Sequence, residues 1–261
     1  MQIYNSFFDP SLKLIYFNDT QYRPNLVSYL AMRQDYSPNP IYLKYEKFAQ
    51  LTEEELGHRV WDHAVKFNHF GVMEHSGLVF NVVGFPHDVP MQHRTHRVGV
   101  SFDVMSQRYT GKHFYSQYQK DLLTATGNIF SDSFIKKYFY LDIIGQTYSN
   151  REGTTYANNR EIEQIRIAGI RSQLIIYCQL LEKGVPEERA RRDLPQGIRQ
   201  HYIFSCNPRS LEHLLDVRTS KDVQFEFRLL SELFMEFYQD FNPLMAEKYK
   251  EKRYQKNKLS P

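Results

Sequence analysis

A predicted β-strand runs directly into a predicted helix in residues 197–218, which have the sequence GIRQHYIFSCNPRSLEHLLDVR. We assign the strand to residues 197–206. Asn207 and Pro208 then have the pattern of a helix start. Asn can cap backbone N–H groups that lack a partner, and Pro fits the first helical position because its missing N–H would be unpaired there anyway.

A second strand and a helix are predicted earlier in the chain. Residues 52–70 open with a capping box, formed by Thr52 and Glu55, and their apolar side chains recur on one helical face. Residues 76–85, SGLVFNVVGF, are rich in β-branched and aromatic side chains and end at a proline. This composition predicts a strand that is mostly buried.

Two long helices complete the prediction. The first covers residues 160–183 and ends at Gly184, after which Pro186 starts a short helix. The second covers residues 222–240, where aromatic and aliphatic residues share a face, and Pro243 ends it. Helices outnumber strands, and the strands are not separated by regular helical crossovers. We therefore expect an α+β fold, arranged as a single domain because about 250 residues can form one.

The composition favours a soluble globular protein. Of the 261 residues, 41% are hydrophobic and 24% charged, which is enough to build a core and disfavours intrinsic disorder. The two cysteines, Cys178 and Cys206, exclude a disulfide framework and a Cys-rich metal site. The first residues, MQIYNSFFDPSLK, do not resemble a signal peptide, and no apolar run approaches the ~20 residues needed to cross a bilayer. We expect a cytoplasmic protein that does not contact a membrane.

The positive charge is concentrated at the C-terminus. The chain has 33 Lys and Arg against 30 Asp and Glu, a net charge of +3. Residues 248–261 have a net charge of +5, which leaves −2 for residues 1–247. A basic domain that binds nucleic acid is therefore disfavoured for residues 1–247. We expect the domain to cover residues 1–247 and the basic tail, 248–261, to be a solvated helical extension or a frayed end.

The densest polar stretch covers residues 92–109, QHRTHRVGVSFDVMSQRY. Its arginines can donate forked hydrogen bonds to phosphate oxygens, and its serines can add hydroxyl donors. A solvated basic loop is the alternative interpretation. His93 and His96 have the spacing of a metal-binding pair, but no third Cys, His or carboxylate stands at ligand spacing, which disfavours a metal site.

A second polar stretch covers residues 190–218. Arg191 lies just before Leu194-Pro195, and Arg209 falls in the first turn of the helix that Asn207 caps. Helix N-termini attract anions through their free N–H groups and the helix dipole. Two of these residues also have a purely structural interpretation. Capping of the helix is enough to explain Asn207, and Arg218 can offset the C-terminal end of the helix dipole.

Together the two stretches resemble the flavin-dependent thymidylate synthase family, of the ThyX type. The family fingerprint is Arg-His-Arg, then Ser after seven or eight residues, continuing as x-Arg-Tyr. This chain has Thr95-His96-Arg97, eight residues, Ser106 and then Gln107-Arg108-Tyr109. Further matches, in order along the chain, are Glu74-His75, Gln92, Ala190-Arg191, Leu194-Pro195, Asn207-Pro208-Arg209-Ser210-Leu211 and Val217-Arg218. The resemblance spans roughly residues 25–245.

Three positions depart from the family pattern. Thr95 replaces the first Arg of the fingerprint, although Arg94 stands immediately before it. Asp103-Val104 replaces the Asn-Glu that the family frequently has just before the fingerprint serine, here Ser106. His213 stands where the family often has Asn. These departures put individual contacts in doubt rather than the activity.

The resemblance implies reductive methylation of dUMP to dTMP. The one-carbon unit would come from methylenetetrahydrofolate and the reducing equivalents from NADPH through FAD. It also implies a twisted antiparallel sheet flanked by helices, and a homotetramer with shared active sites. Small molecules, rather than nucleic acid, are the expected partners.

The resemblance also assigns residues to roles. Arg218 would be catalytic, because a guanidinium can stabilise negative charge on the uracil ring but cannot act as a base near neutral pH. The residues expected to bind dUMP are Gln92, Arg94, Ser106, Gln107, Arg108, Arg191 and Arg218. The residues expected to bind FAD are His75, Thr95, His96, Arg97, Val98, Asn207, Arg209 and His213. No metal-binding residue is expected.

Two other functions are consistent with the same residues. In the first, the chain is a non-catalytic nucleic-acid-binding module that uses the basic 92–109 loop and the basic tail. This hypothesis predicts salt-dependent binding of polynucleotide and no bound chromophore. In the second, the chain is a flavoprotein of the same fold with a different substrate, because Thr95 and Val104 depart from the pattern. A yellow purified protein would favour either flavoprotein over the nucleic-acid-binding module.

Overall fold

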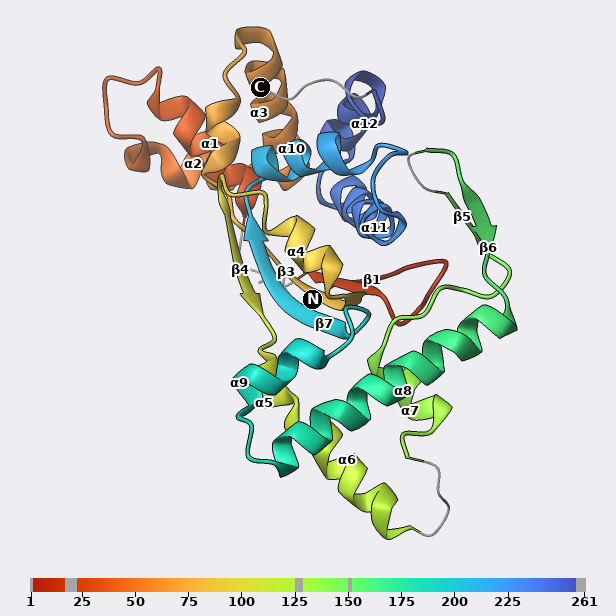
Figure 1. The fold of residues 1–261 in the computed structure, drawn as a ribbon. Coiled ribbons are helices and arrows are strands. Elements are labelled where there is room, and N and C mark those ends of the chain that lie inside the picture. The colour runs from red at the N-terminus through yellow and green to blue at the C-terminus, as the bar shows by residue number, and fades with distance from the viewer. Residues whose placement is uncertain (1, 17–22, 125–128, 150–151, 257–261) are drawn as a thin grey trace. The chain divides into compact units, whose positions relative to one another are not determined.

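The computed structural model describes residues 2–16, 23–124, 129–149 and 152–256 (Figure 1). These residues form two compact units that are interleaved along the chain. Unit 1 comprises residues 1–82, 94–103 and 203–261, and unit 2 comprises residues 83–93 and 104–202.

A five-stranded sheet has the order β1-β2-β3-β7-β4. Its strands are β1 (Gln2–Asn5), β2 (Lys13–Tyr16), β3 (Leu78–Pro86), β4 (Val100–Val104) and β7 (Arg199–Cys206). The predicted strands at 76–85 and 197–206 are confirmed as the neighbours β3 and β7, whereas β1, β2 and β4 were not predicted. β1 and β2 pair antiparallel, with Gln2 opposite Tyr16. Helices and an antiparallel sheet together give the expected α+β class.

Unit 1 contains six α-helices among its described residues. They are α1 (Pro24–Gln34), α2 (Tyr45–Ala49), α3 (Glu53–Phe67), α10 (Pro208–Arg218), α11 (Phe225–Phe241) and α12 (Pro243–Lys252), with short 3₁₀ turns at Ile41–Lys44 and Phe70–Glu74. In Figure 1, α11 lies beside α10 and α12, and both pairs are in contact. α11 was predicted at 222–240, and it begins three residues later.

Aromatic side chains form much of the core of unit 1. Phe80 on β3 stacks on Phe204 of β7, with ring centroids 6.1 Å apart. Phe234 and Phe237 of α11 meet the Phe80 ring edge-on, at 5.2 and 4.8 Å. Edge-to-face contacts add to the stabilisation that burial of the rings provides. Aromatic residues make up 15% of the sequence, and part of them therefore serves packing rather than ligand binding.

The predicted helix starts agree with the structure. The Thr52 side chain accepts a hydrogen bond from the Glu55 N–H, and the Glu55 carboxylate accepts one from the Thr52 N–H, so the capping box is formed. The Asn207 side chain caps α10 by accepting from the Ser210 N–H at 2.8 Å. This cap orients the first turn of the helix that ends at Arg218.

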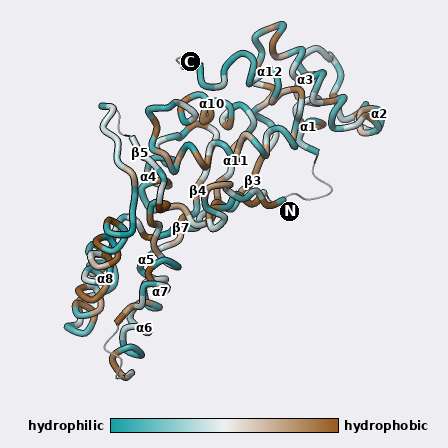
Figure 2. The backbone as a smooth tube through the Cα atoms, turned by 90° about the vertical axis from the view of Figure 1, so that its right-hand side faces the viewer, coloured by the Kyte–Doolittle hydropathy of each residue, from teal (hydrophilic) through white to brown (hydrophobic). Residues whose placement is uncertain are grey.

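Unit 2 is built around the 23-residue helix α8 (Arg160–Glu182). Around it are α4 (Asp88–His93), α5 (Gln107–Thr110), α6 (Lys112–Leu123), α7 (Asp132–Tyr138), α9 (Glu187–Ala190), the 3₁₀ turn Arg191–Asp193 and the hairpin of β5 (Thr147–Ser149) and β6 (Thr155–Ala157). Apolar and polar positions alternate along α8 in Figure 2, and α6, α7 and α9 contact this helix. The buried positions include Ile167, Leu174 and Tyr177. Gly184 ends α8 with φ +80°, as predicted.

The basic C-terminal segment is not solvated throughout. α12 crosses the boundary expected at residue 248, and Tyr249 is fully buried. Arg253 forms ion pairs with the buried carboxylates of Glu212 and Asp216. A frayed end is therefore the wrong description of residues 248–253, because burial and ion pairing hold them against unit 1. Residues 257–261 lie outside the described residues.

None of the helices in the described ranges is both long and apolar enough to span a bilayer.

Candidate functional site

The predicted site residues divide between the two units according to their expected ligand. Unit 1 contains every residue expected to bind FAD, together with Arg94 and Arg218. Unit 2 contains Gln92, Ser106, Gln107, Arg108 and Arg191, which are expected to bind dUMP. The structure therefore separates the two predicted sets along the chain, except for the two arginines in unit 1.

In unit 1, residues 94–99 form a loop that is fastened to the start of α10. The Ser210 hydroxyl donates to the Val98 carbonyl at 2.9 Å. Ser210 is also the residue whose N–H is capped by Asn207. The contact brings two motifs together that are more than 100 residues apart in the sequence.

Gly99 allows this close approach. Its φ is +66°, and a Cβ added there would lie 2.4 Å from the Ser210 Oγ and 2.7 Å from the Asn207 Nδ2. Side chains with a Cβ disfavour this backbone region, and the two atoms leave no space for one.

We expect Gly99→Ala to destabilise the protein by about 1–3 kcal/mol and to lower its flavin content, because the loop must leave α10. Gly71→Ala is the control, since a Cβ at this position, in a 3₁₀ turn of the same unit, meets only the His69 ring, at 3.9 Å. The control should be neutral or stabilising by up to about 1 kcal/mol. Urea unfolding and flavin absorbance measure both effects. A Gly99→Ala protein with wild-type stability and flavin content would contradict the role of the glycine.

Arg218, at the C-terminal end of α10, contacts the same loop. Its Nε donates to His96 Nε2 at 2.9 Å, and a terminal nitrogen donates to the Thr95 hydroxyl at 3.0 Å. On the other side, its guanidinium lies 4.7 Å from the ring centroid of Phe227. The predicted catalytic arginine is thus in direct contact with two predicted FAD ligands.

The electrostatics of this group favour a neutral histidine beside a charged arginine. The pKa of His96 is lowered to about 4, first because burial disfavours the charged ring and then because Arg218 and His213 lie close to it. The rings of His96 and His213 meet edge-on at 5.7 Å. A neutral His96 that accepts at Nε2 carries its proton on Nδ1. Burial also lowers the pKa of Arg218, but a guanidinium stays protonated near neutral pH.

The depressed pKa of His96 predicts a pH dependence of stability. The unfolded ring takes up a proton near pH 6.5, whereas the folded ring resists protonation until about pH 4. This contribution to stability is present above pH 6.5 and is lost as the pH falls toward 4, with a slope of at most about 1.4 kcal/mol per pH unit. In His96→Gln the amide oxygen can accept from Arg218 without titrating. Urea unfolding at pH 8, 6 and 5 should show the variant losing less stability than the wild type. Parallel losses in the two proteins would contradict the assignment.

The exposed arginines of the loop are available to an anion. Arg94 and Arg97 are exposed, and in the described ranges no carboxylate lies within ion-pairing distance of either. Arg209 differs, because it forms an ion pair with Glu74. His75 is exposed beside Glu74, and the described residues offer no contact that joins it to the loop.

In unit 2, the residues expected to bind dUMP gather on two short helical turns that touch. Ser106 precedes α5, which carries Gln107 and Arg108, and α5 contacts α9. α9 leads directly into the turn that begins with Arg191. Arg108 and Arg191 are both exposed, and among the residues that the structure covers neither has a carboxylate partner. Gln92 lies apart from them in sequence, on α4.

Comparison with known proteins shows the family. The family of the thymidylate synthase complementing protein matches residues 18–244. The flavin-dependent thymidylate synthase of Haloarcula marismortui is 31% identical over 213 residues, which cover 80% of this chain and 81% of the relative. That of Halobacterium salinarum is 30% identical over 198 residues, covering 74% and 75%. The chain belongs to the flavin-dependent thymidylate synthase family.

Solved structures share the fold. A ThyX thymidylate synthase from Helicobacter pylori, solved with FAD and dUMP, superposes with a TM-score of 0.62 at 18% identity, covering 91% of this chain and 98% of the other. The UMP/dUMP methylase PolB from Streptomyces cacaoi, solved with 5-Br dUMP, gives a TM-score of 0.65 at 18% identity, covering 92% and 95%. The flavin-dependent thymidylate synthase fold is therefore present in this chain.

The two histidines with metal-like spacing have separate roles in this member of the flavin-dependent thymidylate synthase family. His93 is fully buried, and its Nδ1 lies 2.9 Å from the Tyr202 hydroxyl. His96 accepts from Arg218. Each histidine therefore has a side-chain hydrogen-bond partner of its own.

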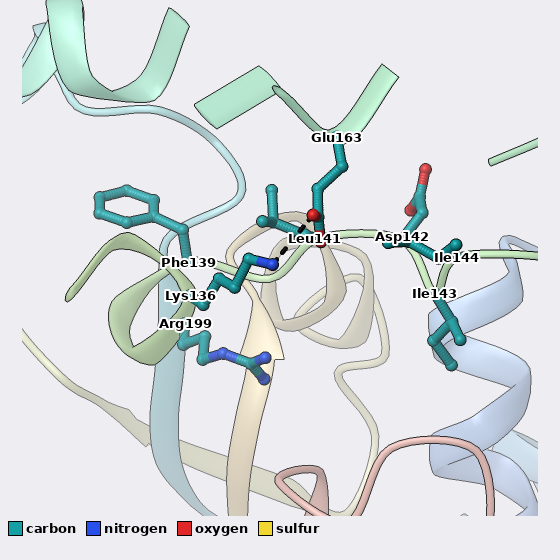
Figure 3. A pocket seen from close by; sticks show the side chains of 8 residues that line it. All are labelled: Lys136, Phe139, Leu141, Asp142, Ile143, Ile144, Glu163 and Arg199. Atoms are coloured by element: carbon teal, nitrogen blue, oxygen red, sulfur yellow. Dashed lines mark hydrogen bonds and ion pairs between the residues drawn. The ribbon is translucent and has the colours of Figure 1, made fainter. Parts of the chain in front are cut away.

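A cavity of about 340 Å³ in unit 2 contains none of the predicted site residues. Figure 3 shows the Lys136 ammonium directed at the Glu163 carboxylate, and the two are 2.9 Å apart. The full lining is Lys136, Phe139, Leu141, Asp142, Ile143, Ile144, Glu163 and Arg199. Lys136 and Glu163 therefore pair with each other, and Asp142 pairs with Arg166, which lies outside the lining.

Three residues that shape the site were given no role in it from the sequence. Gly99 and Ser210 join the loop to α10, and Phe227 supports Arg218. A glycine three residues after His96 was a usable signal, because turns often need positive φ. The sequence placed Phe227 only on the apolar face of the helix predicted at 222–240, and the packing of α11 brings it to Arg218.

Proposed function

We propose that this chain is a flavin-dependent thymidylate synthase that converts dUMP to dTMP. Methylenetetrahydrofolate would supply the one-carbon unit, and NADPH would supply the reducing equivalents. The observation that carries the proposal is the arrangement of Arg218, held between neutral His96 and Phe227 and in contact with Thr95. Such a fixed cation suits charge that develops on a uracil ring.

The residues of unit 1 fit a bound FAD. Arg97 is exposed, and no carboxylate in the described part of the chain forms an ion pair with it. The loop that carries Arg97 adjoins the N-terminal turn of α10. Forked arginine donors and helix N–H groups are the donors that a pyrophosphate prefers. When bound, FAD would carry reducing equivalents from NADPH to the one-carbon unit. We assign His75, Thr95, His96, Arg97, Val98, Asn207, Arg209 and His213 to FAD.

The exposed arginines of unit 2 support a nucleotide phosphate site. Arg108 and Arg191 lie on turns joined by the contact of α5 with α9. Ser106 and Gln107 add a hydroxyl and an amide for the sugar or the base. We assign these four residues, with Gln92, Arg94 and Arg218, to dUMP. The Helicobacter pylori neighbour was solved with FAD and dUMP, which supports FAD and dUMP as the two ligands.

Arg218 would act by charge and position. Its guanidinium cannot remove a proton near neutral pH, but it can stabilise negative charge at O2 and N3 of the pyrimidine. That stabilisation makes C5 a better nucleophile. The neutral His96 accepts a hydrogen bond from the guanidinium and so orients it, and it adds no second positive charge beside it.

This route requires no cysteine nucleophile, and both thiols are poor candidates for one. Burial raises the pKa of Cys178 to about 12 and also raises that of Cys206 well above its usual range. A protonated buried thiol is inert. We expect Cys206→Ala and Cys178→Ala each to retain dTMP formation within about threefold when assayed well below the melting temperature. A folded Cys206→Ala protein that holds FAD and dUMP but forms no dTMP would contradict a cysteine-independent route.

We also propose a cytoplasmic homotetramer that does not use nucleic acid as a partner. Ile165 and Ile176 are exposed on α8, as apolar residues at a subunit contact would be in the isolated chain. Sizing of the purified protein measures the assembly.

The test of the proposed function is an assay of the purified protein. We expect flavin absorbance, and dTMP formation from dUMP that requires both methylenetetrahydrofolate and NADPH. UMP is assayed beside dUMP, because one structural neighbour is a UMP/dUMP methylase. Product from UMP alone would establish a different substrate. A colourless protein that forms no product and binds polynucleotide in a salt-dependent manner would favour the nucleic-acid-binding alternative.

A further inference from the structure

The end of α12 and Arg253 lie beyond the residues that match the family, 18–244, yet they are joined to the helix that carries Arg218. Helix α10 buries two carboxylates one turn apart, those of Glu212 and Asp216. Arg253 forms ion pairs with both. All of these residues belong to unit 1.

The contacts of Arg253 form a fixed fork. Its Nη1 donates to Glu212 Oε2 at 2.6 Å, its Nε donates to Asp216 Oδ1 at 3.2 Å, and its Nη2 donates to the second Asp216 oxygen. The Tyr238 hydroxyl of α11 donates to Glu212 at 2.6 Å, and the Tyr249 hydroxyl of α12 donates to Asp216 at 3.1 Å. The planar guanidinium therefore sets both the rotation and the axial position of α10.

Arg218 follows Asp216 by two residues, so a shift of the clamped turn reaches it directly. Glu212 and Asp216 lie one turn apart on one face of α10, and the helical period places Arg218 on the other side of the helix. Displacements of about 1 Å in a positioned group can lower a rate strongly.

We propose that Arg253 is a positioning residue for Arg218, which it orients by clamping Glu212 and Asp216 on the opposite face of α10. This inference rests on the proposed function of Arg218.

The test compares Arg253→Met with Arg23→Met. Arg23 is the matched control, because its side chain is also 28% exposed and also pairs with a carboxylate, Glu53, but it joins α1 to α3. Both proteins are assayed at least 15 °C below their melting temperatures with saturating FAD. We expect Arg253→Met to lower kcat for dTMP at least tenfold with KM for dUMP within threefold, and Arg23→Met to keep kcat within twofold. Arg253→Lys keeps the charge without the fork and should give an intermediate kcat.

A triple variant separates positioning from charge balance. The triple variant combines Glu212→Gln, Asp216→Asn and Arg253→Met, and it removes both buried carboxylates together with their cationic partner. Because no unpaired buried charge remains, we expect it to fold even where Arg253→Met alone does not. We expect kcat of the triple variant to stay at least fivefold below wild type, because the fork is absent.

Two results would overturn the inference alone, given an active wild type. These are wild-type kcat in the folded triple variant, or an equal loss of kcat in Arg23→Met and Arg253→Met. A wild-type protein that forms no dTMP would overturn the proposed function, and this inference with it.

Discussion

Arg218→Ala should lower kcat for dTMP formation by about 10²–10³-fold, while the protein still binds FAD. A donor aimed at charge that develops in a transition state typically contributes this much to the rate. The structure supports the size of the effect, because contacts with His96, Thr95 and Phe227 already fix the Arg218 side chain. The guanidinium therefore needs little rearrangement when the substrate reacts. Product formation at saturating dUMP, with flavin content measured by absorbance, gives the result.

Arg218→Lys is the informative companion. Lysine keeps a positive charge, but its donors all lie on one nitrogen, so it cannot reproduce the planar fork by which arginine spans His96, Thr95 and the substrate. We expect its kcat to lie between those of the wild type and Arg218→Ala. Wild-type turnover in Arg218→Ala would remove Arg218 from the catalytic role, and loss of flavin in both variants would assign Arg218 to the cofactor instead.

Arg191→Ala and Arg108→Ala should each weaken dUMP binding without loss of FAD. Each substitution removes a charge-assisted contact of roughly 1.5–3 kcal/mol, which corresponds to roughly a 10- to 150-fold rise in Kd. Both arginines are exposed in unit 2, where they have no carboxylate partner among the described residues, so their charge is not already neutralised. Calorimetric titration with dUMP, and flavin content, measure the two ligands separately.

Arg192→Ala is the matched control, since Arg192 adjoins Arg191 in the same 3₁₀ turn and is also exposed. Arg192→Ala should leave both the Kd for dUMP and the flavin content at their wild-type values. Arg97→Ala should have the opposite pattern, with depleted flavin and a Kd for dUMP close to wild type once FAD is restored. If Arg191→Ala lost flavin and kept its affinity for dUMP, the division of the site between the two ligands would be reversed.

Local signals in the sequence were sufficient for the elements whose causes are local. The caps at Thr52 and Asn207 and the helix end at Gly184 were predicted, because each depends on backbone groups within four residues. The strands β3 and β7 were predicted from their β-branched and aromatic residues, which favour extended backbone. β1 and β4 were missed, since four or five residues of ordinary composition become strands only when a neighbouring strand pairs with them.

The candidate residues of the site were also readable from the sequence, because the family motifs keep their order and spacing along the chain. Their mutual contacts were not. The bond from Arg218 to His96 joins residues 122 positions apart, and the fork from Arg253 to Asp216 joins residues 37 positions apart. The sequence assigned Arg253 to a solvated tail on charge alone. Only folding buries Glu212 and Asp216, and a buried carboxylate needs a cationic or hydrogen-bonding partner in reach. Composition and motifs therefore determined the family and the chemical groups available, whereas the tertiary structure decided which charges are desolvated and which of them are paired.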